Sequence, residues 1–404
     1  MAGSLTPGSL TLGSLTLGSL TLGSLTPEQF LSQHWQRSPL LIRNALPGFQ
    51  SPLSPDELAG LACEDEVESR LVLGKLGGGW RVEHGPFESE RLERLPERDW
   101  TLLVQDVDKW VPELGQLLSA FRFIPDWRID DIMISFAAPG GSVGPHTDQY
   151  DVFLLQAQGR RRWQLSAEFD PALLPDVDLK ILERFVPEQQ FVVEPGDLLY
   201  LPPNVAHYGL ALDAALTYSI GFRAPDRREL VGALAEQLMS HAGDVRFQDP
   251  GRSPSERPSR LAEADLRQLR ELVRSGLVLA DAELDGFLGR YLTRPKPNLE
   301  VSGEPIDARR VERRLRGGER LVRRLGARLL LLPRDELWLF ADGQEHRLGL
   351  SELDWLEPLA DGAGFDAAQL DRHPGALGLL SSLVGAGSLE WQGAAAGPDS
   401  SKKP

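Results

Sequence analysis

Short hydrophobic runs separated by Gly and Pro turns dominate the first half of the chain. Three of these runs occupy residues 67–73, 80–84 and 100–104. Runs of this length, bounded by turn residues, are typical of strands in sandwiches and barrels. A helical run at Val111–Phe121 separates them from the strands that follow. The pattern therefore predicts an antiparallel, barrel-like β domain.

Residues 130–136 alternate between two kinds of side chain. Successive side chains of a strand point to opposite faces. The apolar face of this segment carries Ile132, Ile134 and Phe136. The polar face carries Asp131, Met133 and Ser135. We therefore expect a strand with one face toward the core and one face free for chemistry.

Two runs at residues 152–157 and 160–165 flank a turn at Gly159, and we interpret them as a hairpin. The second run begins with Arg160, Arg161 and Arg162. Because strand alternation cannot leave all three in solvent, at least one must point inward. Arg161 is well placed to reach into the barrel, where its guanidinium would clamp a carboxylate of an anionic cosubstrate.

After Asp226 the hydrophobic period becomes helical. Three stripes follow, at Leu230/Leu234/Leu238, at Leu266/Leu269/Val273 and at Leu284/Phe287/Leu288/Tyr291. They predict a helical segment over residues 226–295, which ends in a linker at 295–298. Beyond it, residues 308–315 and 319–325 are predicted helices, and 328–333 with 336–341 a hairpin. Two helices and a hairpin indicate a winged-helix domain over residues 296–392.

Both ends of the chain are of low complexity. Residues 3–27 repeat Gly-Ser-Leu-Thr followed by Leu or Pro, so we expect residues 1–26 to be a disordered tail. Residues 393–404 are expected to be a second one. Between the tails, the first helix begins where Thr26 and Gln29 can form a capping box, with Pro27 at its first position.

His146, Asp148 and His207 are the candidate metal ligands. On a strand, His146 and Asp148 would point to the same side, and His207 follows a second turn-rich segment. Two imidazoles and one carboxylate form the facial triad of non-haem Fe(II) oxygenases, which leaves the remaining positions open. Zinc catalysis is the alternative, although a closed structural zinc site is excluded because Cys63 is the one cysteine.

Composition narrows the choice of partners. A chain of 404 residues with 41% hydrophobic content is long enough for two or three globular domains. Its formal charge of -16 disfavours general nucleic-acid binding and suits a basic protein partner. Nine arginines between Arg309 and Arg328 form a local exception, which we interpret as solvated helix faces. One cysteine and no long apolar run favour the cytoplasm and no membrane span.

The segments 132–165 and 194–203, His207 and the closing run 218–225 together resemble the JmjC-type 2-oxoglutarate oxygenases. Within them the chain is most similar to the bacterial ribosomal oxygenases, which hydroxylate an arginine of large ribosomal subunit protein L16. The resemblance implies a mixed α and β fold, in which a double-stranded β-helix (a cupin-like jelly roll) occupies residues 27–225. It also implies that the helical segment forms a homodimer.

The resemblance assigns roles as well. His146, Asp148 and His207 would hold Fe(II), with 2-oxoglutarate as cosubstrate and O2 as oxidant. Ser135 and Arg161 would bind the distal carboxylate of 2-oxoglutarate. The arginine of a basic ribosomal protein would be bound by residues on the same side of the barrel, namely Asp131, Met133, Tyr150 and Ser219.

Three alternatives remain open from the residues. A lysine demethylase of the same superfamily would use the same iron site on another protein. A cupin isomerase or dioxygenase more often presents a His-x-His pair. A ligand-sensing transcription regulator, which is not an enzyme, would also combine a barrel with a winged helix, and sequence-specific DNA binding without succinate formation would identify it.

Overall fold

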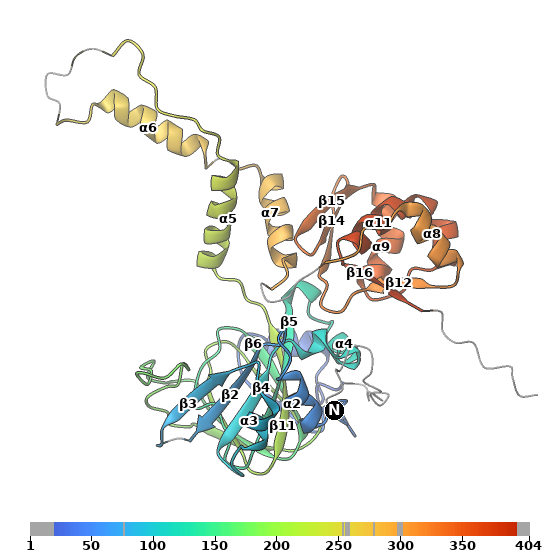
Figure 1. Cartoon of the computed structure of the whole chain (residues 1–404). Helices are drawn as coiled ribbons and strands as arrows, with labels where there is room; N and C mark the ends of the chain where they lie inside the picture. The colour runs from blue at the N-terminus through green and yellow to red at the C-terminus, as the bar shows by residue number, and fades with distance from the viewer. Residues whose placement is uncertain are drawn as a thin grey trace, which may run out of the picture. The chain divides into compact units, whose positions relative to one another are not determined.

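A computed structural model describes residues 20–393 except 76, 253, 255–258, 278 and 297–301. The described chain divides into two compact units that meet in sequence between Ala224 and Pro225 (Figure 1). The predictions for residues 1–19, 297–298 and 394–404 lie outside the described residues. Residues 20–26, however, do not form a disordered tail, because Leu22 packs in the core and Thr21 N–H donates to Ala45 O at 2.9 Å.

The first unit consists of two antiparallel sheets with short helices. An eight-stranded sheet has the order β1-β9-β6-β11-β5-β4-β2-β3, and a three-stranded sheet the order β10-β7-β8. The strands are β1 Leu40–Ile42, β2 Ser69–Gly74, β3 Trp80–His84, β4 Trp100–Val104, β5 Ile129–Ala137, β6 Asp151–Gln158, β7 Arg161–Ser166, β8 Gln189–Val193, β9 Leu198–Leu201, β10 Ala206–Ala211 and β11 Ala215–Phe222. The helices are α1 Pro27–Gln33, α2 Pro55–Leu61, α3 Ser89–Glu93 and α4 Pro112–Ser119. This is the predicted jelly roll.

The predicted hairpin of residues 152–165 is wrong. β6 lies between β9 and β11, and both of its edges are occupied by these strands. β7 therefore has no free edge of β6 to pair with, and it joins β10 and β8 in the other sheet. The chain crosses from one sheet to the other at Gly159, whose φ of 64° is left-handed.

Aromatic side chains fill the core behind the large sheet. Helix α1 begins at the predicted capping box of Thr26 and Gln29 and buries Phe30. The Phe30 ring lies 5.0 Å from that of Tyr200 and 5.5 Å from that of Phe153, between ring centroids. Such contacts add to the free energy gained by burying the rings.

Asp151 is the buried anchor of this core. Its side chain is fully buried and forms an ion pair with Arg128 at 3.0 Å. The Tyr200 hydroxyl donates to Asp151 Oδ1 at 2.6 Å, and Gln36 Nε2 donates to Oδ2 at 2.9 Å. Three donors thus stabilise one carboxylate, as a buried charge requires.

The second unit combines three helices with a mixed domain. α5 Arg227–His241, α6 Glu263–Ser275 and α7 Asp281–Thr293 match the predicted stripes. The domain that follows contains α8 Ala308–Arg316, β12 Arg320–Arg323, β13 Leu329–Pro333, β14 Leu337–Ala341, β15 Gln344–Leu348, α9 Leu353–Ala360, α10 Ala367–Arg372, α11 Leu377–Gly385 and β16 Leu389–Gln392. None of the helices that the structure describes is long and apolar enough to cross a membrane.

The predicted helix at residues 319–325 is wrong. Residues 320–323 form β12, which pairs with β16 in the register Leu321 to Trp391. Leu321 is fully buried in the domain core. A strand far away in the sequence therefore decides the conformation of this segment, and local helix propensity does not.

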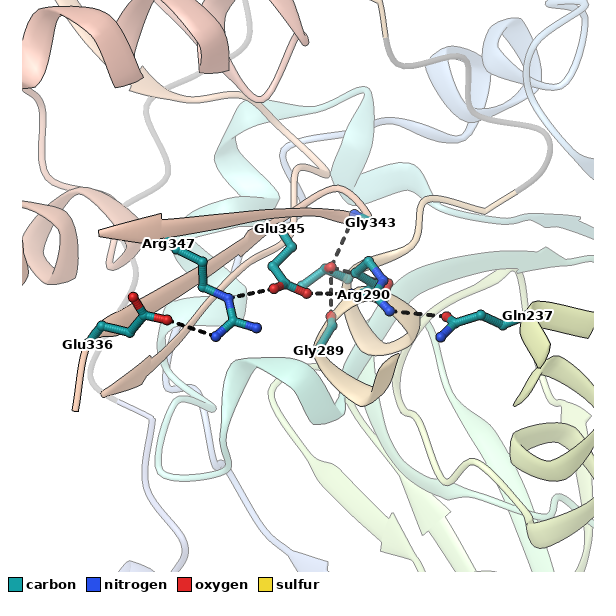
Figure 2. Close-up of polar contacts among 8 residues, drawn as sticks. Gln237, Gly289, Arg290, Glu336, Gly343, Glu345 and Arg347 are labelled. Carbon is teal, nitrogen blue, oxygen red and sulfur yellow. Dashed lines mark hydrogen bonds and ion pairs between the residues drawn. The ribbon is translucent and has the colours of Figure 1, made fainter. Parts of the chain in front are cut away.

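Helix α7 is fixed to the β14–β15 hairpin by a polar network (Figure 2). Arg290 forms an ion pair with Glu345 and also donates to Gln237 Oε1 of α5 at 3.1 Å. Arg347 donates to the other oxygen of Glu345 at 2.6 Å. Gly289 packs so closely that a Cβ there would lie 2.3 Å from the Phe340 ring. The helical segment and the winged-helix region therefore share one packed structure, although we had predicted a boundary between them.

Asp151→Ala should lower the free energy of unfolding by about 3 to 5 kcal/mol, since it leaves Arg128 and the Tyr200 hydroxyl without their buried anion. Urea unfolding followed by tryptophan fluorescence measures this difference. Asp178→Ala serves as the control because its ion pair with His84 is solvent-exposed, with 81% of the Asp178 side chain accessible. Equal stability of the two variants would contradict the anchoring role.

Candidate active site

One cavity of about 720 Å³ lies between the two sheets of the first unit. Its lining includes Asp131, Met133 and Ser135, while Ile132 and Ile134 are buried in the core on the other face. The alternation predicted for this strand is thus confirmed. All nine candidate site residues contribute to the lining, the other six being His146, Asp148, Tyr150, Arg161, His207 and Ser219.

His146, Asp148 and His207 come together at the cavity wall. Their ligand atoms all lie within 4.8 Å of one another. His207 Nε2 is 3.6 Å from Asp148 Oδ2, and the two imidazole centroids are 4.2 Å apart. It is the one cluster of three potential ligands found in the described part of the chain. Two nitrogens and one oxygen at this spacing fit the facial arrangement that suits Fe(II).

Both imidazoles are oriented by their second nitrogen. Nδ1 of His146 lies 2.9 Å from Gly144 O, and Nδ1 of His207 lies 3.0 Å from Val205 O. A carbonyl can only accept, so each Nδ1 carries the proton and each Nε2 keeps a free lone pair. A carbonyl that accepts from Nδ1 in this way fixes the ring orientation and prepares Nε2 to bind a metal.

The two histidines are also joined through their backbones. His146 N–H donates to His207 O at 3.0 Å, and His207 N–H donates to His146 O at 2.9 Å. His146 is otherwise outside any strand, so our prediction that His146 and Asp148 share a strand is wrong. Asp148 is held instead by a hydrogen bond from Asn204 N–H to its carbonyl at 2.8 Å.

Burial sets the charge of the cluster. It lowers the pKa of His207 to about 4, and the neighbouring His146 acts in the same direction. His207 is therefore neutral at physiological pH, which is the form that binds a metal. Because burial disfavours the charged imidazole, His207 needs no deprotonation step before it can bind a metal.

Arg161 is a buried charge that forms no ion pair with any residue in the described part of the chain. Its side chain is buried, and neither Nε nor Nη2 has a hydrogen-bond partner. Burial lowers its pKa to about 10, so it stays protonated. The guanidinium carbon lies 5.6 Å from the centre of the Trp163 ring, which faces Gly209 closely enough that a Cβ there would sit 2.6 Å from the indole.

Unsatisfied polar atoms gather in this cavity. Eleven buried side-chain N or O atoms in the described residues lack a partner, and six of them belong to the lining: Arg70 Nε, Thr101 Oγ1, Gln105 Oε1, Arg161 Nε, Arg161 Nη2 and Trp163 Nε1. Native interiors tolerate few such atoms, so their concentration indicates a ligand. Thr101, Gln105 and Trp163 were missed by the sequence analysis, because their direction depends on strand pairing.

Asp197 and His84 are not part of the cavity lining. Asp197 accepts hydrogen bonds from Asn44 N–H at 2.9 Å and Glu194 N–H at 3.1 Å, which gives it a structural role in this turn. His84 lies outside the metal cluster and contacts Asp178 at 3.0 Å.

Comparisons with known proteins agree with this geometry. Residues 116–230 match the JmjC domain family, and residues 266–390 match the ROXA-like winged helix. The ribosomal protein uL16 3-hydroxylase of Escherichia coli K12 is 38% identical over 372 residues, which cover 90% of this chain and 97% of the relative. The probable ribosomal oxygenase of Haemophilus influenzae is 35% identical over 85% of this chain and 88% of its own.

Solved structures show the same likeness. The X-ray structure of E. coli YcfD superposes with a TM-score of 0.78 at 36% identity, over 91% of this chain and 99% of that one. A structure of YcfD, described as a ribosomal oxygenase, in complex with cobalt and 2-oxoglutarate has a TM-score of 0.76 at 37% identity, over 92% and 99%. The fold, the metal-binding geometry and these relatives together show that this chain belongs to the bacterial JmjC-type ribosomal oxygenases, a family of Fe(II)- and 2-oxoglutarate-dependent enzymes.

Proposed function

We propose that this enzyme hydroxylates a side-chain carbon of an arginine in ribosomal protein uL16, with release of succinate and CO2. The observation that carries the proposal is the opposite polarity of the two ends of the cavity. Arg161 makes one end an anion site. Asp131 makes the other end a cation site. A single cavity thus suits a dicarboxylate at one end and an arginine side chain at the other.

Strand register supports the placement of Arg161 and Asp131 at opposite ends of the cavity. Ala137, Ala211 and Ala215 pack together at one level, and Ala211 is paired with Arg161. His207 lies four residues along β10 from Ala211, and Met133 lies four residues along β5 from Ala137. Because strands rise about 3.3 Å per residue, His207 and Met133 are at similar heights. Asp131 lies two residues farther still, so the metal ligands separate the anion end from the cation end.

His146, Asp148 and His207 would hold Fe(II), with the distal carboxylate of 2-oxoglutarate bound by Arg161 and Ser135. When bound, the iron and 2-oxoglutarate supply the oxidative chemistry with O2. The protein's part is to hold the substrate carbon near the metal and to exclude water from the closed end. The buried Trp163 and Arg161 perform the second task.

At the cation end, acceptors face the cavity. Asp131 is buried, and its Oδ2 accepts from Asp106 N–H at 3.2 Å. Val104 pairs with Ile134 in antiparallel register. Gln105 follows Val104, so the Gln105 side chain comes beside Met133. Its Oε1 has no partner and can accept an N–H from a guanidinium. Ser219, paired with Met133, adds a hydroxyl, while Met133 and Tyr150 would contact the aliphatic stem.

Homodimerisation through the helical segment is a second part of the proposal. Apolar side chains on these helices are exposed in the single chain, including Met239 at 69% and Val273 at 61%. Exposed apolar groups in such numbers mark an interaction surface.

The arginines of residues 309–328, by contrast, support the absence of direct nucleic-acid binding. Arg314 pairs with Glu319, and Arg316 pairs with Glu312 and Asp371. A cytoplasmic location would follow from a ribosomal substrate.

His146→Ala should reduce arginine hydroxylation by more than about 100-fold, because losing a ligand costs more than the 10- to 100-fold typical of outer-shell changes. Mass spectrometry of uL16 incubated with Fe(II), 2-oxoglutarate and O2 measures the added oxygen. His84→Ala should retain full activity. One added oxygen on an arginine peptide distinguishes hydroxylation from demethylation, and no mass change on any ribosomal protein, despite succinate release, would reject the proposed substrate.

Asp131→Asn should raise the KM for a uL16 peptide by roughly 10- to 100-fold, since it removes the charge while its amide oxygen can still accept from Asp106 N–H. Uncoupled conversion of 2-oxoglutarate to succinate should persist, and steady-state kinetics separates the two effects. If both reactions fell equally, Asp131 would be a structural residue and not part of the substrate site.

Val273→Asp should shift the enzyme from dimer to monomer, because it places a charge in the proposed apolar interface. Sedimentation velocity on the full chain measures the change. Arg274→Asp, at the adjacent position of the same helix, is the control for an added negative charge. A wild-type protein that sediments as a monomer would contradict the homodimer.

A further inference from the structure

The end of the cavity at Arg161 contains one more buried polar side chain, on a strand outside the metal-binding segments. Arg161 is paired with Ala211, which packs against Ala137, and Ala137 is the direct cross-strand partner of Thr101. Directly opposed residues on neighbouring strands share a face of the sheet. Thr101 therefore lies at the level of Arg161, and it lines the same cavity.

Among the residues that the structure describes, none forms a hydrogen bond with the Thr101 hydroxyl. The residue is completely buried, and its Oγ1 makes no hydrogen bond. Its neighbours across the strand on either side are Val72 and Ala137, which have no side-chain acceptor. Thr217, also in the lining, is different, because its hydroxyl donates to Gln156 Oε1 at 3.1 Å. A buried orphan hydroxyl costs free energy unless a ligand satisfies it.

A bound carboxylate would have enough acceptor positions to include the Thr101 hydroxyl among its donors. Its two oxygens offer about four acceptor positions. The free Nε and Nη2 of Arg161 can take two of them as a fork, one on each oxygen. The Ser135 hydroxyl, two residues along β5 from Ala137 toward the metal ligands, can take a third acceptor position. One acceptor position then remains for a further donor, and Thr101 lines the cavity at this level.

We infer that Thr101 donates a hydrogen bond to the distal carboxylate of 2-oxoglutarate and forms, with Arg161 and Ser135, a three-residue clamp. The inference rests on the proposed assignment of Arg161 and Ser135 to that carboxylate. It makes Thr101 a binding residue for the cosubstrate, contributed by a strand that carries no metal ligand.

The test is Thr101→Val, which removes the hydroxyl and keeps the shape of the side chain. Isothermal titration of 2-oxoglutarate into the full-length enzyme containing Mn(II), which replaces Fe(II) and prevents turnover, should show about 10-fold weaker binding, equivalent to one lost charge-assisted hydrogen bond. Thr101→Ser should restore the affinity. Without 2-oxoglutarate, Thr101→Val should melt at the same temperature as the wild type or higher, because no hydrogen bond of the unliganded protein is lost.

Thr217→Val is the matched control. It breaks the bond to Gln156, so it should lower the melting temperature but change the 2-oxoglutarate affinity by less than about 2-fold. Unchanged 2-oxoglutarate binding in Thr101→Val would overturn the inference, as would a loss of affinity that Thr101→Ser does not restore.

The variant Arg161→Met tests the carboxylate site independently of Thr101. If it abolishes 2-oxoglutarate binding while Thr101→Val binds normally, the carboxylate site stands and the role of Thr101 falls. If Arg161→Met binds 2-oxoglutarate as well as the wild type, the proposed carboxylate site itself is wrong, and the inference fails with it.

Discussion

Two backbone hydrogen bonds between His146 and His207 hold the candidate metal site together. His207 belongs to a strand of the small sheet, whereas His146 lies in a loop that has no other ladder contact. The reciprocal bonds extend the sheet by one pair of residues and thereby fix the distance between the two imidazoles. Because each ring is also fixed through Nδ1, the geometry for a metal is set by the main chain before any ion arrives.

The rest of the cavity follows from the alternation of side chains on the strands around this centre. β5 and β11 present polar groups at successive levels, and β7 and β10 present Arg161 and His207 on the facing sheet. The cavity thus changes from a cationic end to an anionic end over a few strand residues. Such a gradient can orient two substrates of opposite charge without a conformational change of the protein.

Much of this architecture was predictable from periodicity. The face that contains Asp131, Met133 and Ser135 followed from period-two alternation alone, and helices α5 to α7 followed from their apolar stripes. The candidate metal ligands were proposed from residue type and family resemblance, and they do lie together, although His146 and Asp148 are outside a strand. His146 is positioned by its bridge to His207 and Asp148 by its hydrogen bond from Asn204, and a strand pattern reveals neither contact.

The errors share one physical origin, namely contacts between segments far apart in sequence. β6 could not pair with β7 because β9 and β11 occupy its edges, and residues 320–323 became a strand because β16 pairs with them. Gln105 and Thr101 were overlooked for the same reason. Their side chains are ordinary in the sequence and gain significance only when β4 is placed beside β5.

The uncompensated charge of Arg161 has a thermodynamic consequence beyond the site. A protonated guanidinium enclosed without an anion makes the empty protein less stable than it would be with a neutral side chain there. A dianion that occupies the cavity removes this penalty, and by mass action it raises the folded fraction in proportion to its concentration relative to Kd. If 2-oxoglutarate is that dianion, its concentration sets the folded fraction of the enzyme as well as the rate of turnover.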